Sequence, residues 1–350
     1  MERFEVKNSG KYAYPVILTG LVILFLIYFK SLIQPFILAL IVWYLIRITR
    51  EGLNGLSIYK KRLPTWLSGL LSIAITFGII FIIFIIIQVN INDIIDSAPK
   101  YNQNFENLLS NVTALTGISD IDEYLRQKLL TLDLNNFAKM FLSGISNLLS
   151  DGTMVLIYLI FLLMEEKLIP LKLQKIKENG LNANTWLAMI NKISHSVNLY
   201  MGVKVVMSLL TAVLSYFIMI FIGVDFAILW AFLIFILNFI PFVGSLVATL
   251  FPSFFAVFQF GEVGPFLWTF CSVFMVQLLV GNLVEPKLMG KTLNMSPLIV
   301  IISLSFWGSI WGILGMILSV PMVSILIIIL AHFPKTRNIA ILFSENGVVT

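Results

Sequence analysis

A single glutamate stands at the end of an apolar run, in the segment Gly281–Lys291 (GNLVEPKLMGK). Glu285 directly precedes Pro286, and a residue before proline is disfavoured in the helical conformation, so we expect a helix to end here. Asn282 and Gln277 lie three and eight residues earlier, roughly on the same helical face. If these groups and the freed carbonyls face one cavity, they can bind a cation or load a proton. The alternative is a helix end at which Glu285 simply meets Lys287 and solvent.

The composition indicates what surrounds these polar groups. The chain has 350 residues, 59% of them hydrophobic and 12% charged, against about 25% charged in an ordinary soluble domain. The mean hydropathy is +0.97, more apolar surface than a soluble core of this size could bury. We therefore expect lipid to surround most of the chain. The run from Tyr12 to Phe29 has no small-residue cleavage site, so it reads as a retained span.

The apolar runs predict an all-α polytopic membrane protein with about eight transmembrane helices. The expected segments are N-terminal transmembrane helices (1–89), an external helical insert (90–143), a transmembrane helix (144–164), a cytoplasmic amphipathic helical segment (165–199), a C-terminal transmembrane core with broken helices (200–333) and a cytoplasmic tail (334–350). The run from Ser296 to Ala331 is too long for one span, and Trp307–Gly312 (WGSIWG) indicates a break within it. Two spans in a hairpin, or a re-entrant half-helix followed by one span, both fit this pattern.

The basic residues predict the orientation. With the N-terminus in the cytoplasm, 18 of the 23 Lys and Arg residues fall on the cytoplasmic side. The five on the outside are Lys30, Lys100, Arg126, Lys128 and Lys139. We therefore expect both termini in the cytoplasm, and the net charge of +5 reflects this asymmetry rather than binding of nucleic acid.

Proline and glycine repeatedly interrupt the apolar runs from Phe226 onward, whereas the early spans are almost purely aliphatic and aromatic. Non-helical backbone at membrane depth survives only where it is buried in protein or lines a wet cavity. Broken helices of this kind aim backbone groups at the substrate in secondary transporters. This half is therefore the candidate pathway, although structural kinks are the simpler alternative. The candidate pathway or gate residues are Gln277, Asn282, Glu285, Pro286, Asn238, Pro241, Gly244, Gly290, Pro297, Gly312, Gly315 and Pro321.

Other chemistry is not indicated. The chain lacks the HExxH zinc motif, the GxSxG nucleophile turn and the GxxxxGK[ST] phosphate loop, so we expect neither an enzyme nor an ATP-driven pump. His195 and His332 are isolated and Cys271 is the single cysteine, so we expect no metal site, no cofactor and no intrachain disulfide. Asp225 precedes an apolar run and is expected to cap the N-terminus of that helix.

The late motifs resemble those of the autoinducer-2 exporter family of prokaryotic membrane proteins. They are NFIPFVG (Asn238–Gly244), NLVEPKLMG (Asn282–Gly290), SPL (Ser296–Leu298) and GILGMILSVP (Gly312–Pro321). The resemblance covers essentially the whole chain, and the motifs are specific in combination rather than singly. It implies a multi-span exporter in the cytoplasmic membrane of a prokaryote, working as a homo-oligomer. Members of such families are linked to a furanosyl signalling molecule and some to sodium/proton exchange, so the resemblance does not fix the cargo.

Three functions follow from these patterns. The first is a secondary exporter of a small polar organic molecule, such as a quorum-sensing signal, coupled to protons through Glu285. The second is a sodium (or lithium)/proton antiporter, which the absence of a visible mid-membrane carboxylate pair disfavours. The third is a membrane scaffold that binds partner proteins through the external insert. The expected partners are the lipid bilayer, a small polar solute or cation, and further copies of the chain.

Overall fold

The computed structural model describes residues 9–55, 64–116, 152–178, 183–289 and 294–347. Every regular element in these residues is a helix. The N-terminal half contains α1 (Ser9–Tyr28), α2 (Lys30–Gly55), α3 (Thr65–Thr116), α6 (Gly152–Glu166), α7 (Ile169–Glu178) and α8 (Ala183–Ile222). The C-terminal half contains α9 (Ala227–Leu237), α10 (Val243–Phe260), α11 (Val263–Leu278), the π-helix η2 (Leu279–Val284), α12 (Glu285–Met289), α13 (Pro297–Trp311), α14 (Ile313–His332) and α15 (Arg337–Phe343).

Two helices are much longer than a bilayer is thick. α3 has 52 residues and α8 has 40, which correspond to about 78 Å and about 60 Å at 1.5 Å per residue. The hydrocarbon core is about 30 Å thick, so both helices must extend into water or the lipid headgroups. The expected boundary between the N-terminal transmembrane helices and the external insert (89/90) falls inside α3. The expected boundary between the cytoplasmic segment and the C-terminal core (199/200) falls inside α8. Residues 117–151, which include the second half of the expected insert, lie outside the described residues.

The long final run is divided at Gly312 into two helices of unequal length. α13 has 15 residues, about 22 Å, whereas α14 has 20 residues, about 30 Å. Of the two arrangements left open by the sequence, this geometry favours a short half-helix followed by one helix long enough to span. The tip of this pair is held by α1 and α2: the Trp311 indole donates to the Leu26 carbonyl at 3.3 Å, and the Gln34 amide donates to the Trp311 carbonyl at 3.0 Å.

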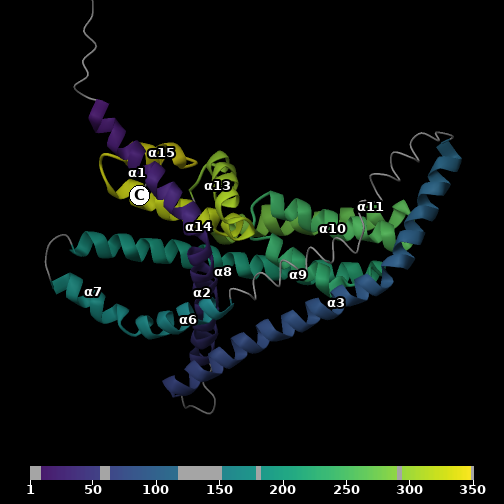
Figure 1. The fold of residues 1–350 in the computed structure, drawn as a ribbon, viewed down its shortest axis with the longest axis horizontal. Helices are drawn as coiled ribbons and strands as arrows, with labels where there is room; N and C mark the ends of the chain where they lie inside the picture. The colour runs from purple at the N-terminus through teal and green to yellow at the C-terminus, as the bar shows by residue number, and fades with distance from the viewer. Residues whose placement is uncertain (1–8, 56–63, 117–151, 179–182, 290–293, 348–350) are drawn as a thin grey trace, which may run out of the picture.

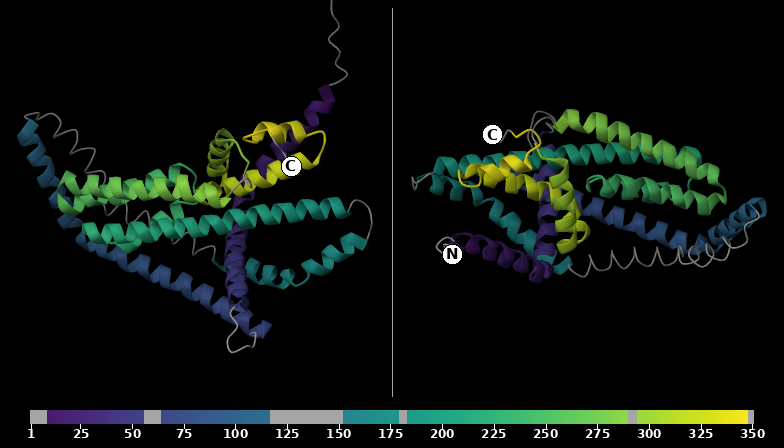
Figure 2. Two further views of the ribbon diagram at one scale, coloured as in Figure 1. Left: turned by 180° about the vertical axis from the view of Figure 1, so that it is seen from behind. Right: turned by 90° about the horizontal axis from the view of Figure 1, so that it is seen from above.

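The C-terminal helices pack alongside α8. In Figures 1 and 2, α8, α10 and α11 run side by side, while α2 stands at a steep angle to them. The largest core cluster lies among α3, α8, α9, α10 and α11 and is centred on Met219, Trp230, Phe255 and Val273. A separate cluster joins α2 to α6 through Ala39, Ile46 and Leu159.

The outer surface is apolar. Phe221 is 94% exposed and Trp268 is 72% exposed, together with many aliphatic side chains on α1, α3 and α8. Six described helices are long and apolar enough to cross a membrane, and α9, α13 and part of α1 form shorter apolar helices. These features confirm the predicted fold class, an all-α polytopic membrane protein.

Candidate functional site

Glu285 lies within a continuous helical segment that contains a π-helical turn. The six residues Leu279–Val284 join α11 to α12, and the Glu285 amide donates to the Val280 carbonyl, five residues earlier. The expectation that Pro286 ends the helix is wrong, because the chain stays helical through Met289. A proline ring clashes with the carbonyl four residues before it in an α-helix. The wider π turn, which includes Asn282, relieves that clash, and such turns are frequent at functional sites.

The carboxylate of Glu285 forms an ion pair with a lysine from another helix. Lys204 Nζ on α8 lies 2.7 Å from Glu285 Oε1, and the two side chains are only 11% and 18% exposed. The pairs Arg47–Glu51 and Lys172–Glu165 are much more exposed. Exposed pairs of that kind contribute little to stability, whereas a pair removed from water is held only if each charge keeps its partner. The Lys204–Glu285 contact therefore couples α8 to α12 strongly.

Two buried polar groups on the helical segments that carry the ion pair have no hydrogen-bond partner within the described part of the chain. They are the Tyr200 hydroxyl and the Gln277 Nε2 amide. Tyr200 precedes Lys204 by one turn of α8 and lies within electrostatic range of Glu285. Its ring packs in a cluster with Val320, Val323 and Ile327 of α14. Glu285, Lys204 and Tyr200 thus form a candidate site between α8, the α11–α12 segment and α14, and Gln277 lies about two turns before Glu285 on that segment.

Asn282 differs from Gln277 and Glu285 in its exposure. Gln277 is buried and Glu285 partly buried, but Asn282 is exposed, so the three do not form the continuous polar stripe that regular α-helical spacing predicts. The physical reason is the π turn, whose i→i+5 hydrogen bonds place an extra residue in the turn and rotate the residues within it away from α-helical register.

The other predicted pathway residues form turns or lie elsewhere. Asn238 follows α9 and Pro241 lies in the α9–α10 turn, and a Cβ on Gly244 would overlap the Leu237 carbonyl oxygen. Gly312 joins α13 to α14 at φ +63°, and a Cβ on Gly315 would overlap the Trp307 carbonyl oxygen. These glycines therefore allow close backbone contacts that build the two turns. Pro286 is exposed in α12, Pro297 starts α13, Pro321 is buried in α14, and Gly290 lies outside the described residues.

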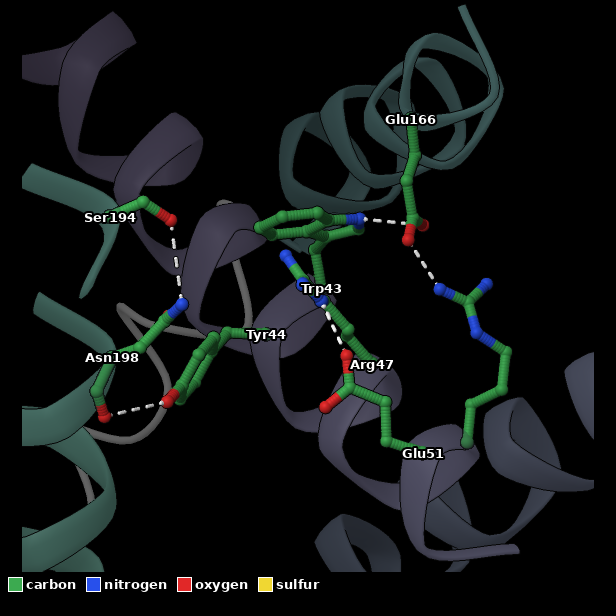
Figure 3. A network of polar contacts seen from close by, with 8 residues as sticks. Trp43, Tyr44, Arg47, Glu51, Glu166, Ser194 and Asn198 are labelled. Carbon is green, nitrogen blue, oxygen red and sulfur yellow. Dashed lines mark hydrogen bonds and ion pairs between the residues drawn. The ribbon is translucent and has the colours of Figure 1, made fainter. Parts of the chain in front are cut away.

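A second polar network joins α2, α6 and α8 and was not anticipated from the sequence (Figure 3). Glu166 at the end of α6 accepts a hydrogen bond from the Trp43 indole at 3.1 Å and pairs with Arg50, both on α2. The Tyr44 hydroxyl donates to the Asn198 carbonyl of α8 at 3.4 Å. In the sequence, charged residues at helix ends indicate only the orientation in the membrane. The signal for this contact is the presence of Trp43, Arg47 and Arg50 on one helix and of the successive Glu165 and Glu166 on another.

A third network joins the outer part of α3 to two turns. The Tyr101 hydroxyl donates to Asp225 Oδ2 at 2.8 Å, and the Asp225 amide donates to Gln259 Oε1 at 2.8 Å. Gln259 Nε2 in turn donates to the Gly223 carbonyl at 2.8 Å. The prediction that Asp225 caps a helix is wrong, because α9 starts at Ala227 and the residue before it, Phe226, makes no side-chain cap. Asp225 instead accepts from a tyrosine that the sequence places 124 positions earlier.

Among the described residues, no group of three His, Cys, Asp or Glu side chains is placed to hold a metal ion. The chemistry of the candidate site is therefore that of one carboxylate, one ammonium group and one phenol. Such a set can exchange protons, bind a small cation or form several hydrogen bonds to a polar solute.

The fold, with a partly buried ion pair beside a π turn, defines a polytopic helical membrane protein, and comparison with known proteins identifies its family. The AI-2E family transporter model matches residues 15–335, so the chain belongs to this family of bacterial membrane transporters. AI-2 transport protein TqsA of Escherichia coli strain K12 is 28% identical over 342 residues, which are 94% of this chain and 95% of that protein.

Two further relatives are each named "Putative transport protein". The one from Haemophilus influenzae is 29% identical over 292 residues, covering 82% of this chain and 84% of the relative. The one from Borreliella burgdorferi is 30% identical over 202 residues, covering 57% of this chain and 56% of the relative. The family and these relatives identify a membrane transporter or permease.

Proposed function

We propose that the protein is a secondary exporter of a small polar organic molecule, such as the quorum-sensing signal AI-2, and that Glu285 couples export to inward movement of protons. The observation that supports this most is the partly buried Lys204–Glu285 pair with the unpaired Tyr200 hydroxyl in its electrostatic range. AI-2 is the solute in the name of the E. coli relative.

The ion pair suggests how a proton and a solute could exchange. While Glu285 is ionised, its carboxylate and the Lys204 ammonium satisfy each other and hold α12 against α8. A solute with hydroxyl groups can donate to the ionised Glu285 carboxylate, and protonation of Glu285 removes this charged acceptor and so favours release of the solute. The unpaired Tyr200 hydroxyl, within electrostatic range of Glu285, adds a further hydrogen-bonding group. Loss of the proton restores the carboxylate for the next solute, so proton and solute occupy the site in turn, as an exchange requires.

Transport of AI-2 in proteoliposomes tests this proposal. Vesicles loaded with AI-2 receive a pH gradient that drives protons in the direction opposite to the solute, and release is measured against vesicles without protein. We expect faster release with the gradient, and loss of that acceleration in Glu285→Gln. An equal rate of AI-2 release with and without the pH gradient would contradict proton coupling. A response of lumenal pH to sodium or lithium, but none to AI-2, would replace the exporter with the cation antiporter. If folded protein shows neither AI-2 release nor a response of lumenal pH to sodium or lithium, the result would favour the scaffold.

We further propose that the transporter resides in the cytoplasmic membrane with both termini in the cytoplasm and works as a homo-oligomer. The distribution of Lys and Arg supports the orientation. Exposed aromatic side chains such as Phe221 offer apolar surface that lipid or a second copy could cover. Cross-linking in native membranes that gave only monomer would contradict the oligomer.

A further inference from the structure

The interface between α8 and α11 contains polar side chains that the ion pair does not use. Ser208, Thr211 and Ser215 follow Lys204 at spacings of four, three and four residues, so they share one face of α8. All three are essentially fully buried. Thr269 and Gln277, eight residues apart on α11, are buried as well. From Lys204 to Ser215 this face extends over roughly 17 Å.

The packing of neighbouring residues places these polar side chains between the two helices. Met207 of α8 packs against Val276 and Val280 of the α11–η2 segment on one side. Ala212 and Met219 of α8 belong to the cluster that contains Val273 of α11 on the other side. The α8 face of Lys204, Ser208, Thr211 and Ser215 lies between these two apolar contacts. We call these four residues, with Thr269, Gln277 and Glu285, the α8–α11 seam.

Most of the seam lacks the hydrogen bonds that buried hydroxyls normally make. Serine and threonine in helices usually donate to the carbonyl four residues before, as Thr211 does to Met207 at 2.9 Å and Ser253 does to Thr249 at 2.7 Å. Ser208 Oγ, Ser215 Oγ, Thr269 Oγ1 and Gln277 Nε2 have no partner anywhere in the residues that the structure describes. Buried polar groups are nearly always paired, so four unpaired ones along a single interface require an explanation.

We propose that the residues of the α8–α11 seam line the solute path, which is closed in this structure. During transport α8 and α11 separate and admit water and a small solute rich in hydroxyl groups. In the closed form the four polar groups are buried without partners, which is unfavourable. Separation of α8 from α11 gives each of them a water or solute partner, and Glu285 at one end controls the separation through its contact with Lys204. The inference rests on the proposed transport function and adds its route and the chemistry of its solute.

Cysteine accessibility tests the seam directly. In a Cys271→Ser background, Ser208→Cys, Ser215→Cys and Thr269→Cys each replace a hydroxyl by a thiol of similar size. Ala39→Cys is the matched control, since Ala39 is buried in an apolar cluster of α2, α3 and α6 that contains no residue of α8 or α11. Proteoliposomes engaged in AI-2 release are treated with the charged reagent methanethiosulfonate ethylsulfonate. We expect the seam cysteines to react at least about tenfold faster than the control, because a thiol reacts as its thiolate and needs access to water. Excess AI-2 should slow that reaction.

Equal reaction rates at the seam and control positions, in liposomes that transport, would overturn the proposal. This outcome differs from failure of the proposed function. In that case the wild type would not release AI-2, or its release would be the same as that of the Glu285→Gln variant. If the cysteine variants do not fold, oxidation of native methionines by hydroxyl radicals replaces them. Met207 borders the seam. Turnover should increase oxidation of Met207 relative to the same liposomes without AI-2 and without a pH gradient, and equal oxidation in the two samples would overturn the proposal.

Discussion

Lys204 Nζ lies 2.7 Å from Glu285 Oε1, and this contact joins two helices whose paired residues are 81 positions apart in the sequence. Glu285 is adjacent in sequence to Pro286 and close to Lys287, yet its partner comes from the middle of α8. The π turn before Glu285 sets the direction of its side chain, and the long helix α8 supplies the charge. The site therefore depends on the packing of α12 against α8 rather than on the motif alone.

Neutralising one member of this pair should destabilise the protein. Lys204→Met or Glu285→Gln leaves the other charge without its counter-ion. Loss of one partner of a fully buried pair costs about 3 kcal/mol, so the cost for this partly buried pair is smaller. We expect each single variant to lower the Tm of detergent-purified protein, and the double variant to recover most of the loss because no isolated charge remains. Thermal unfolding followed by circular dichroism measures this. Additive losses in the double variant would show that the two side chains act independently.

Two glycines should resist substitution by alanine. A Cβ at Gly244 or Gly315 would overlap a backbone carbonyl oxygen, that of Leu237 or Trp307, and such overpacking typically costs about 1–3 kcal/mol. Gly69 is the control, since a Cβ there meets no other atom within 4 Å. We expect Gly244→Ala and Gly315→Ala to reduce the yield of folded protein and its Tm. Gly69→Ala should leave the yield unchanged and the Tm unchanged or higher, because alanine favours the helix interior. Equal behaviour of all three would contradict the close backbone contacts.

Tyr101→Phe should loosen the junction between α3 and the α8–α9 turn. The change removes one hydrogen bond to Asp225 but keeps the aromatic contacts with Phe226 and Phe255. Because Asp225 is exposed, we expect a loss of only about 1 kcal/mol. Hydrogen exchange at residues 223–226 should accelerate, while exchange within α10 stays constant. Tyr28→Phe, at an exposed position far from this network, serves as the control. Unchanged exchange at the turn would mean that the hydrogen bond does not restrain it.

Glu166→Gln should weaken the contact between α2 and α6. The glutamate accepts from Trp43 and pairs with Arg50, and a neutral amide keeps the hydrogen bond but loses the charge. We expect a modest effect, about 1 kcal/mol, since Arg50 is partly solvated. Glu51→Gln is the matched control, because its pair with Arg47 is exposed and lies within one helix. Limited proteolysis between α6 and α8 should be faster in Glu166→Gln only, and equal digestion of the two variants would contradict the assignment.

The sequence predicted the helical membrane fold and drew attention to Glu285, but it did not predict the partner of that residue. Composition and hydrophobic run length define a helical membrane protein without any knowledge of tertiary contacts. The pairing of Lys204 with Glu285 depends on how α8 and α12 are aligned along each other. The pattern of apolar residues within each helix gives no information on that alignment. A signal was present, because Lys204 stands in the apolar run GVKVVMSLL, where an unpaired ammonium is unfavourable.

Two further errors have the same kind of cause. Asn282 was expected beside Glu285 because regular α-helical spacing was assumed, and the π turn changes that spacing. Asp225 was expected to cap a helix because its position fits a local rule, but a tyrosine from a distant helix provides its hydrogen bond. In both cases the local pattern was read correctly, and a tertiary contact or an irregular turn determined the outcome.

The measurement that tests the central claim most directly uses proteoliposomes with a pH-sensitive dye inside. AI-2 is added to one side, and lumenal pH is followed for the wild type, Glu285→Gln and Glu262→Gln, the last being an exposed glutamate before α11. The account predicts a solute-dependent pH change in the wild type and in Glu262→Gln that is absent in Glu285→Gln. A full response in Glu285→Gln, from protein with normal folding and AI-2 release, would contradict the role of Glu285 in proton coupling.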